Sequence, residues 1–135
     1  MTQATDTISL SNLLEQAEAQ IETLSVEQVN TIRDNEDTLL VDIRDIRELW
    51  REGTIENAYH APRGMLEFWI AQDSPYTKKQ FQDDKQFVFY CAAGSRSALA
   101  GAIAKRLGLG RVAHMAGGFK AWTDAGLATV EKERK

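Results

Sequence analysis

The sequence predicts an α/β domain with a mostly parallel sheet of about five strands and helices on both faces of that sheet. Two observations support this prediction. Short aliphatic, β-branched or aromatic runs, which suit strands covered on both faces, alternate with segments whose apolar residues recur at helical spacing. In addition, a length of 135 residues is enough for one domain with a substantial apolar core and leaves little room for a second.

The predicted elements follow in the order that such a fold requires. An amphipathic helix is expected over residues 9–24, and Ser25 with Gln28 matches a capping box that starts a second, shorter helix. Asp45 is a suitable N-cap and Gly53 a suitable end for a helix over residues 45–52. The expected strands cover residues 38–43, 58–61, 87–90 and 111–115, and the other expected helices cover residues 65–71, 97–107 and 119–125.

The composition narrows the classes of function. Hydrophobic residues make up 43% of the chain and charged residues 27%, the net charge is −4, and no apolar run approaches the roughly 20 residues of a membrane-spanning helix. We expect a soluble, cytoplasmic protein without a membrane or nucleic-acid partner, because no basic segment precedes an apolar one at the N-terminus and the net charge does not attract phosphate backbones. Cys91 has no second cysteine for a disulfide, and with only His60 and His114 beside it we expect no metal site.

Cys91 is the most informative residue of the chain. It stands where an apolar strand ends and a glycine-containing turn leads into a helix, in the segment CAAGSR of residues 91–96. Small side chains and Gly94 let successive backbone N–H groups converge, and the helix N-terminus and Arg96 add positive charge. These surroundings favour a thiolate and an anionic substrate. A lone cysteine is often an inert core residue, but this position favours Cys91 as a nucleophile.

Four segments in order along residues 25–126 resemble the rhodanese-like sulfurtransferase family. They are LLVDIR with Asp42 and Arg44, Glu48 followed by Gly53-Thr54-Ile55, the loop CAAGSR, and GGFKAW near the C-terminus. The sequence departs from the family pattern at Thr54, where the family commonly has a histidine, which bears on local packing. The stretch PRGMLEFWIAQDSPYTKKQF is longer than the minimal domain needs, which bears on substrate choice.

This resemblance implies a rhodanese-like fold and a sulfurtransferase that needs no cofactor. Cys91 would attack a sulfane sulfur donor such as thiosulfate, become a persulfide, and pass its sulfur to cyanide or to a thiol such as glutathione or a thioredoxin-like protein. Loop amides would hold the sulfur, and the Arg96 side chain would orient the donor anion. Arg63, which follows Pro62 in a loop, is either an added anion contact or a solvated residue. The candidate substrate-binding residues are therefore Ala92, Ala93, Gly94, Ser95, Arg96 and Arg63.

The resemblance also divides the chain. Residues 25–127 would form the rhodanese-like domain, preceded by an N-terminal extension of residues 1–24 with its amphipathic helix and followed by a frayed tail of residues 128–135. The periodicity of this helix is compatible with covering its own sheet, with bridging two protomers or with binding a sulfur acceptor.

Two other classes of function stay open. A rhodanese fold can serve as a non-catalytic interaction module, although the intact loop argues against this. Phosphatases and arsenate reductases that share the fold have one more residue between cysteine and arginine, which widens the cradle for phosphate, whereas here four residues, 92–95, intervene. Sulfur is therefore favoured over phosphate, and no aspartic acid stands in or beside the loop to protonate a leaving group.

Polar residues outside the loop are expected to have structural roles. Asp42 and Arg44 are favoured as a structural ion pair, with Glu48 as a further member of their network. Ser97 is favoured as a hydrogen-bond partner of the loop backbone rather than of the substrate. The two histidines are favoured as hydrogen-bonded strand residues, because the sequence shows no positioned partner that would make either one an acid or a base.

Overall fold

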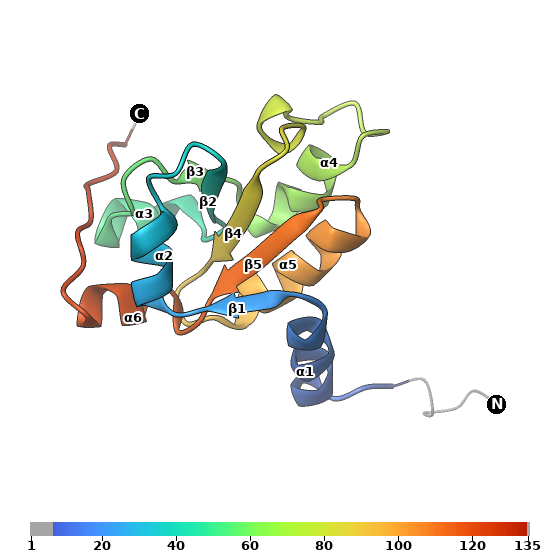
Figure 1. The fold of residues 1–135 in the computed structure, drawn as a ribbon, viewed down its shortest axis with the longest axis horizontal. Coiled ribbons are helices and arrows are strands. Elements are labelled where there is room, and N and C mark those ends of the chain that lie inside the picture. The colour runs from blue at the N-terminus through green and yellow to red at the C-terminus, as the bar shows by residue number, and fades with distance from the viewer. Residues whose placement is uncertain (1–6, 135) are drawn as a thin grey trace.

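Five parallel strands form the central sheet, in the order β1-β5-β4-β2-β3 (Figure 1). The computed structural model describes residues 7–134. Parallel neighbours need crossover connections, and helices supply these connections on both faces of the sheet. The predicted α/β fold is therefore confirmed. The strands are β1 (Glu22–Leu24), β2 (Thr38–Asp42), β3 (Tyr59–His60), β4 (Gln86–Tyr90) and β5 (Arg111–Met115).

The helices cover the sheet from both sides. Helices α4 and α5 pack on one face, α2 and α6 pack on the other, and α1 lies against α5 (Figure 1). The predicted helices and strands that follow residue 25 are present, with ends shifted by at most two residues. The helices are α1 (Leu10–Gln20), α2 (Val26–Ile32), α3 (Ile46–Glu52), α4 (Leu66–Ile70), α5 (Ser95–Arg106) and α6 (Gly118–Asp124), with 3₁₀ turns η2 (Arg63–Met65) and η3 (Lys79–Phe81).

The central strand β4 shows how the two apolar layers arise. Side chains of a strand alternate between its faces, so Phe87 and Phe89 join the layer under α4 and α5 while Val88 and Tyr90 join the layer under α2 and α6. All four side chains are fully buried. Cys91 continues the alternation and belongs to the α5 side, so the strand itself aims the thiol at the helix that follows it.

Local capping signals are confirmed. The Ser25 side chain accepts from the Gln28 N–H and the Gln28 side chain accepts from the Ser25 N–H, which completes the predicted capping box of α2. Asp45 caps α3 and forms the same reciprocal pair with Glu48. Gly53 ends α3 with a positive φ of 85°, a conformation that favours glycine.

The prediction of one helix over residues 9–24 is wrong at its end. Helix α1 ends at Gln20, and residues 22–24 form strand β1, which pairs with β5 at the edge of the sheet. The unpaired backbone groups at the edge of β5 favour an added strand over a further helical turn. Ile21, at the junction, lies so close to Gly101 of α5 that a Cβ at that glycine would stand 2.6 Å from the Ile21 Cδ1 atom.

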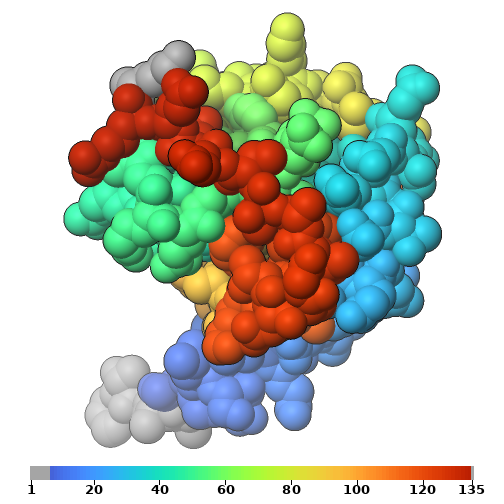
Figure 2. Space-filling view, turned by 90° about the vertical axis from the view of Figure 1, so that its left-hand side faces the viewer, coloured from blue at the N-terminus to red at the C-terminus, as the bar shows by residue number. Residues whose placement is uncertain are grey.

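Two residues of the predicted tail, Ala128 and Val130, form hydrogen bonds with the rest of the domain. Val130 and Thr54 exchange two backbone hydrogen bonds of 2.9 Å, and the Trp122 indole N–H donates to the Ala128 carbonyl at 2.8 Å. Figure 2 shows the C-terminal segment lying across the surface formed by α3 and the residues after it. Residues 1–6 of the predicted extension and Lys135 of the predicted tail lie outside the described residues.

Candidate active site

The loop of residues 91–94 connects the carboxyl end of β4 to the N-terminus of α5. Gly94 occupies the N-cap position of α5 with φ 106°, in the left-handed region. A Cβ at this position would stand 3.2 Å from the Gly117 nitrogen, so both the conformation and the space require glycine. The helix therefore begins immediately beyond the thiol.

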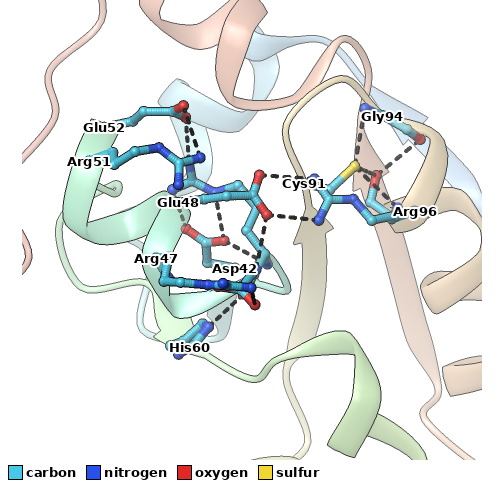
Figure 3. Close-up of polar contacts among 12 residues, drawn as sticks. Asp42, Arg47, Glu48, Arg51, Glu52, His60, Cys91, Gly94 and Arg96 are labelled. Carbon is cyan, nitrogen blue, oxygen red and sulfur yellow. Dashed lines mark hydrogen bonds and ion pairs between the residues drawn. The ribbon is translucent and has the colours of Figure 1, made fainter.

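Hydrogen-bond donors surround the Cys91 sulfur. The Gly94 N–H donates to Sγ at 3.1 Å (Figure 3). The Ser97 N–H donates to Sγ at 3.4 Å. The Ser97 hydroxyl also lies 3.6 Å from Sγ. Cys91 is only 1% exposed. A buried sulfur that faces backbone donors at the N-terminus of a helix is well placed to carry negative charge.

Helix α6 holds the opposite side of the loop. The Phe119 N–H donates to the Cys91 carbonyl at 2.8 Å, and the Lys120 N–H donates to the Ala92 carbonyl at 3.0 Å. Gly118 permits this approach, because a Cβ there would stand 2.5 Å from the Cys91 carbonyl oxygen. The first turn of α6 thus binds the loop carbonyls.

Arg96 faces Glu48 of α3. Its two terminal nitrogens donate to the two Glu48 carboxylate oxygens at 3.0 and 3.1 Å (Figure 3). The hydrogen bond from Arg96 is the largest of the effects that lower the pKa of Glu48. A donor anion that approaches the loop would therefore meet an arginine whose charge Glu48 already balances in part.

The expected ion pair of Asp42 and Arg44 is present and buried. Arg44 binds both Asp42 carboxylate oxygens, at 3.0 and 2.8 Å, and also donates to the Gly53 carbonyl at 2.7 Å. Its guanidinium lies 4.1 Å from the centre of the Phe119 ring. Glu48 makes no hydrogen bond or ion pair with Arg44, and the second carboxylate on Arg44 is that of Glu52, at 3.3 Å.

Thr54, which stands where the family commonly has a histidine, completes this network. Its hydroxyl donates to the Asp42 carboxylate at 2.8 Å and lies 2.8 Å from the Tyr90 hydroxyl. The Tyr90 hydroxyl in turn accepts from the Ile55 N–H at 3.2 Å, and burial raises the pKa of Tyr90. The network joins β2, β4 and the segment after α3 beneath the loop, which accords with the expected packing role of Thr54.

The structure places most of the predicted site residues together, with one exception. Arg63 pairs with Glu67 at 2.8 Å and borders a groove between α1 and α5, and none of its hydrogen bonds or ion pairs within residues 7–134 is with the loop. His60 is a hydrogen-bonded strand residue, as expected, with its Nε2 atom 2.7 Å from the Arg44 carbonyl. Beside the loop, a pocket of about 410 Å³ is lined by Glu52, Ala92, Ala93, Phe119, Lys120 and Thr123.

Two polar side chains behind the sulfur were not predicted as site residues. The Ser97 hydroxyl bonds the Gly94 carbonyl at 3.2 Å, as expected for a backbone contact, but it also lies 3.0 Å from the His114 Nδ1 atom. His114 stands on β5, the strand beside β4 in this sheet. A topology prediction that placed these strands side by side would have brought His114 to the same edge as Cys91.

The described residues suggest neither a metal site nor a membrane span. Within residues 7–134, no three His, Cys, Asp or Glu side chains lie close enough together to hold a metal ion. The longest helix in this range, α5, has 12 residues, and none of the helices is both long and apolar enough to cross a bilayer.

Together, the fold and the site define a class of protein: an α/β domain with a cysteine in an amide-lined loop between a strand and a helix. The family model of the rhodanese-like domain matches residues 25–125. The chain belongs to the rhodanese-like domain family.

Proteins similar to this chain are described with different functions. A sulfurtransferase of Allochromatium vinosum is 35% identical over 76% of this chain and 87% of its own length. A tRNA uridine(34) hydroxylase of Photorhabdus laumondii is 37% identical over 73% of this chain, which corresponds to only 27% of that longer protein. A solved structure from Rhodopseudomonas palustris, described as a protein of unknown function and a possible tyrosine phosphatase, is 48% identical with a TM-score of 0.89 and covers 96% of this chain and 99% of its own.

Proposed function

We propose that this protein is a sulfurtransferase that carries sulfane sulfur as a persulfide of Cys91. The observation on which the proposal rests is the position of the Cys91 sulfur, which accepts two backbone N–H bonds at the N-terminus of α5. The similarity to the Allochromatium vinosum sulfurtransferase over most of both chains supports it.

The proposed reaction has two steps. In the first, the Cys91 thiolate attacks the outer sulfur of a donor such as thiosulfate, the sulfur–sulfur bond of the donor breaks, and sulfite leaves with the bonding electron pair. In the second, an acceptor nucleophile attacks the terminal sulfur of the persulfide, and the Cys91 thiolate leaves. The backbone donors of the loop would stabilise the negative sulfur in both states, and no added oxidant or reductant is required.

The substrates and location are part of the same proposal. Thiosulfate serves as the donor, and cyanide is the acceptor in assays. In the cytoplasm the acceptor is a small thiol such as glutathione, or a thioredoxin-like protein. The pocket lined by Ala92 and Ala93 also has Glu52 and Lys120 in its lining and would receive such molecules.

Phosphatase activity is the second candidate, because the similar Rhodopseudomonas palustris protein is described as a possible tyrosine phosphatase. Two features argue against it. The loop has four residues between cysteine and arginine, one fewer than phosphatase loops of this fold have. Arg96, which would have to bind phosphate, is engaged by both oxygens of Glu48.

Intact-mass spectrometry tests the proposal directly. Incubation with thiosulfate should add one sulfur atom, about 32 Da, to the wild-type protein and nothing to Cys91→Ser, and cyanide or a thiol should remove the addition. Because Cys91 is the chain's single cysteine, the site of the adduct is unambiguous. A folded wild-type protein that forms no labile adduct would refute the proposal, and turnover of an aryl phosphate would favour the second candidate.

A further inference from the structure

A row of polar side chains leads from the Cys91 sulfur to the protein surface. The Ser97 hydroxyl lies 3.6 Å from Sγ, the His114 Nδ1 atom lies 3.0 Å from that hydroxyl, and the His114 Nε2 atom lies 3.7 Å from a Glu18 carboxylate oxygen. Ser97 and His114 are fully buried, whereas the Glu18 side chain is 53% exposed. The row therefore crosses from the loop through α5 and β5 to helix α1.

The Ser97 hydroxyl has one proton and more than one acceptor within reach. If the His114 ring carries its proton on Nε2, Nδ1 is an acceptor, and Ser97 donates to the ring while the thiol donates to Ser97. If the ring carries its proton on Nδ1, that nitrogen donates to the Ser97 hydroxyl, which can then donate to the sulfur or to the Gly94 carbonyl at 3.2 Å. The tautomer of His114 thus decides whether Ser97 suits a thiol or a thiolate.

The second ring nitrogen of His114 faces away from Ser97. The His114 Nε2 atom is buried and has no hydrogen-bond partner among the described residues. A buried nitrogen without a partner is costly unless water or a nearby group serves it. Glu18 stands beside it just beyond hydrogen-bond distance, so a small movement or one water molecule joins the two.

We propose that Ser97, His114 and Glu18 form a proton relay that takes the thiol proton of Cys91 to the surface and leaves Ser97 donating to the thiolate. The thiol proton passes to the Ser97 oxygen, the former Ser97 proton passes to Nδ1, and the Nε2 proton leaves to solvent at Glu18. The sulfur keeps the bonding pair of its S–H bond and becomes the nucleophile. His114 ends neutral with its proton on Nδ1, so no charge remains buried on the ring.

The surroundings of His114 agree with this neutral end state. Burial lowers the pKa of His114, and the negative charge of Glu18 only partly opposes this effect. Of the elements packed against the ring, α1 presents Glu18 and α5 presents Ser97, while the register neighbours from β1 and β4 are the uncharged Thr23 and Phe89. A lasting imidazolium is therefore disfavoured, and exchange between the two neutral tautomers is the lower-energy route.

The relay deepens the proposed function, on which it rests, and it gives helix α1 a role. Helix α1 lies outside residues 25–125, the part of the chain that matches the family model. In this arrangement Ser97 touches the reacting sulfur, whereas His114 and Glu18 act through Ser97 as positioning residues.

The first test is the pH at which the Cys91 thiolate forms, followed by ultraviolet absorbance and by the rate of iodoacetamide alkylation. His114→Phe removes the ring nitrogen that bonds the Ser97 hydroxyl. It should raise the midpoint of thiolate formation by about one pH unit, which slows alkylation about tenfold at neutral pH. His114→Asn places an amide N–H at the position of Nδ1 and should largely restore the midpoint. Glu18→Gln removes the carboxylate that favours the Nε2–H tautomer of the thiol state, so it should lower the midpoint by about half a unit. Glu15→Gln, which changes an exposed carboxylate on the same helix, should leave the midpoint unchanged.

The second test needs no variant of the relay. Nitrogen NMR of the His114 ring should report the Nε2–H tautomer when Cys91 is a thiol and the Nδ1–H tautomer when Cys91 is a thiolate. The same tautomer in both states, or a His114→Phe protein with the wild-type midpoint, overturns the relay. Both measurements are made without a sulfur donor, so a protein that forms no persulfide but shows these shifts would refute the proposed function and keep the relay.

Discussion

Replacing Thr54 by valine tests the buried polar network beneath the loop of residues 91–94. The threonine hydroxyl donates to the Asp42 carboxylate at 2.8 Å and accepts from the Tyr90 hydroxyl at 2.8 Å. Valine has nearly the same shape but no hydroxyl, so the carboxylate loses a donor and the Tyr90 proton loses its acceptor. A hydrogen bond to a charged group is worth about 2 kcal/mol and a neutral one about 1 kcal/mol, so we expect a loss of about 3 kcal/mol of unfolding free energy.

Urea denaturation measures this loss. With a dependence of about 2 kcal/mol per molar urea for a domain of this size, the midpoint should fall by about 1.5 M without a change in slope. Thr129→Val is the matched control, because Thr129 is exposed and its side chain makes no hydrogen bond with any of residues 7–134. This change should alter the free energy of unfolding by less than about 0.5 kcal/mol. If the Thr54 and Thr129 variants were equally stable, the network would not contribute as argued.

Three further changes test other features of the structure. Gly118→Ala should lower the free energy of unfolding by at least about 2 kcal/mol and disturb the Cys91 loop, because φ at this glycine is 63° and the new Cβ would meet the loop backbone. Calorimetry measures the first effect and formation of the thiosulfate adduct measures the second. A variant that matches the wild type in both would contradict this packing. Burial lowers the pKa of His114 from 6.5, so the stability that the neutral ring contributes is complete above pH 6.5 and is lost as the pH falls through this value toward the folded-state pKa. Urea midpoints measured at several pH values should therefore fall over this range in the wild type and fall less in His114→Asn. An equal pH dependence of the two midpoints would refute the lowered pKa of His114. Deletion of residues 128–135 should lower the free energy of unfolding by about 2 kcal/mol, because the Trp122 indole N–H loses its acceptor. Thermal denaturation checks this prediction, and an unchanged midpoint would show that the tail does not stabilise the domain.

Local signals made much of the fold predictable from the sequence. The capping boxes at Ser25 and Asp45 depend on residues three positions apart, so their hydrogen bonds follow from neighbours in the chain. The same is true of the loop that begins at Cys91, since a strand, a glycine turn and a helix in direct succession place the thiol at a helix N-terminus.

The features that the sequence did not predict depend on partners far along the chain. Residues 22–24 continue the apolar spacing of α1, but they form a strand because the edge of β5 lies beside them. Val130 is held by the backbone of Thr54, which no local pattern reveals.

The same limit applies to the site. Arg96 has a cationic side chain at the end of the loop that the sequence predicts to bind anions, and only the packing of α3 brings Glu48 against it. His114 and Ser97 are 17 positions apart and meet because β5 lies beside β4 and α5 packs over both strands. Residue types and spacing predicted Cys91 as the nucleophile of the proposed reaction, whereas its partners could be found only from the topology.

The bonds from α6 to the loop carbonyls have a consequence for the order in which the site forms. Cys91, β4 and α5 all precede Phe119 and Lys120, whose N–H groups hold the Cys91 and Ala92 carbonyls. A growing chain that has reached the end of α5 already contains its thiol and its helix N-terminus, yet nothing from α6 fixes the peptide groups between them. The loop of a nascent chain therefore acquires its final conformation only after one of the last helices has been synthesised and has packed.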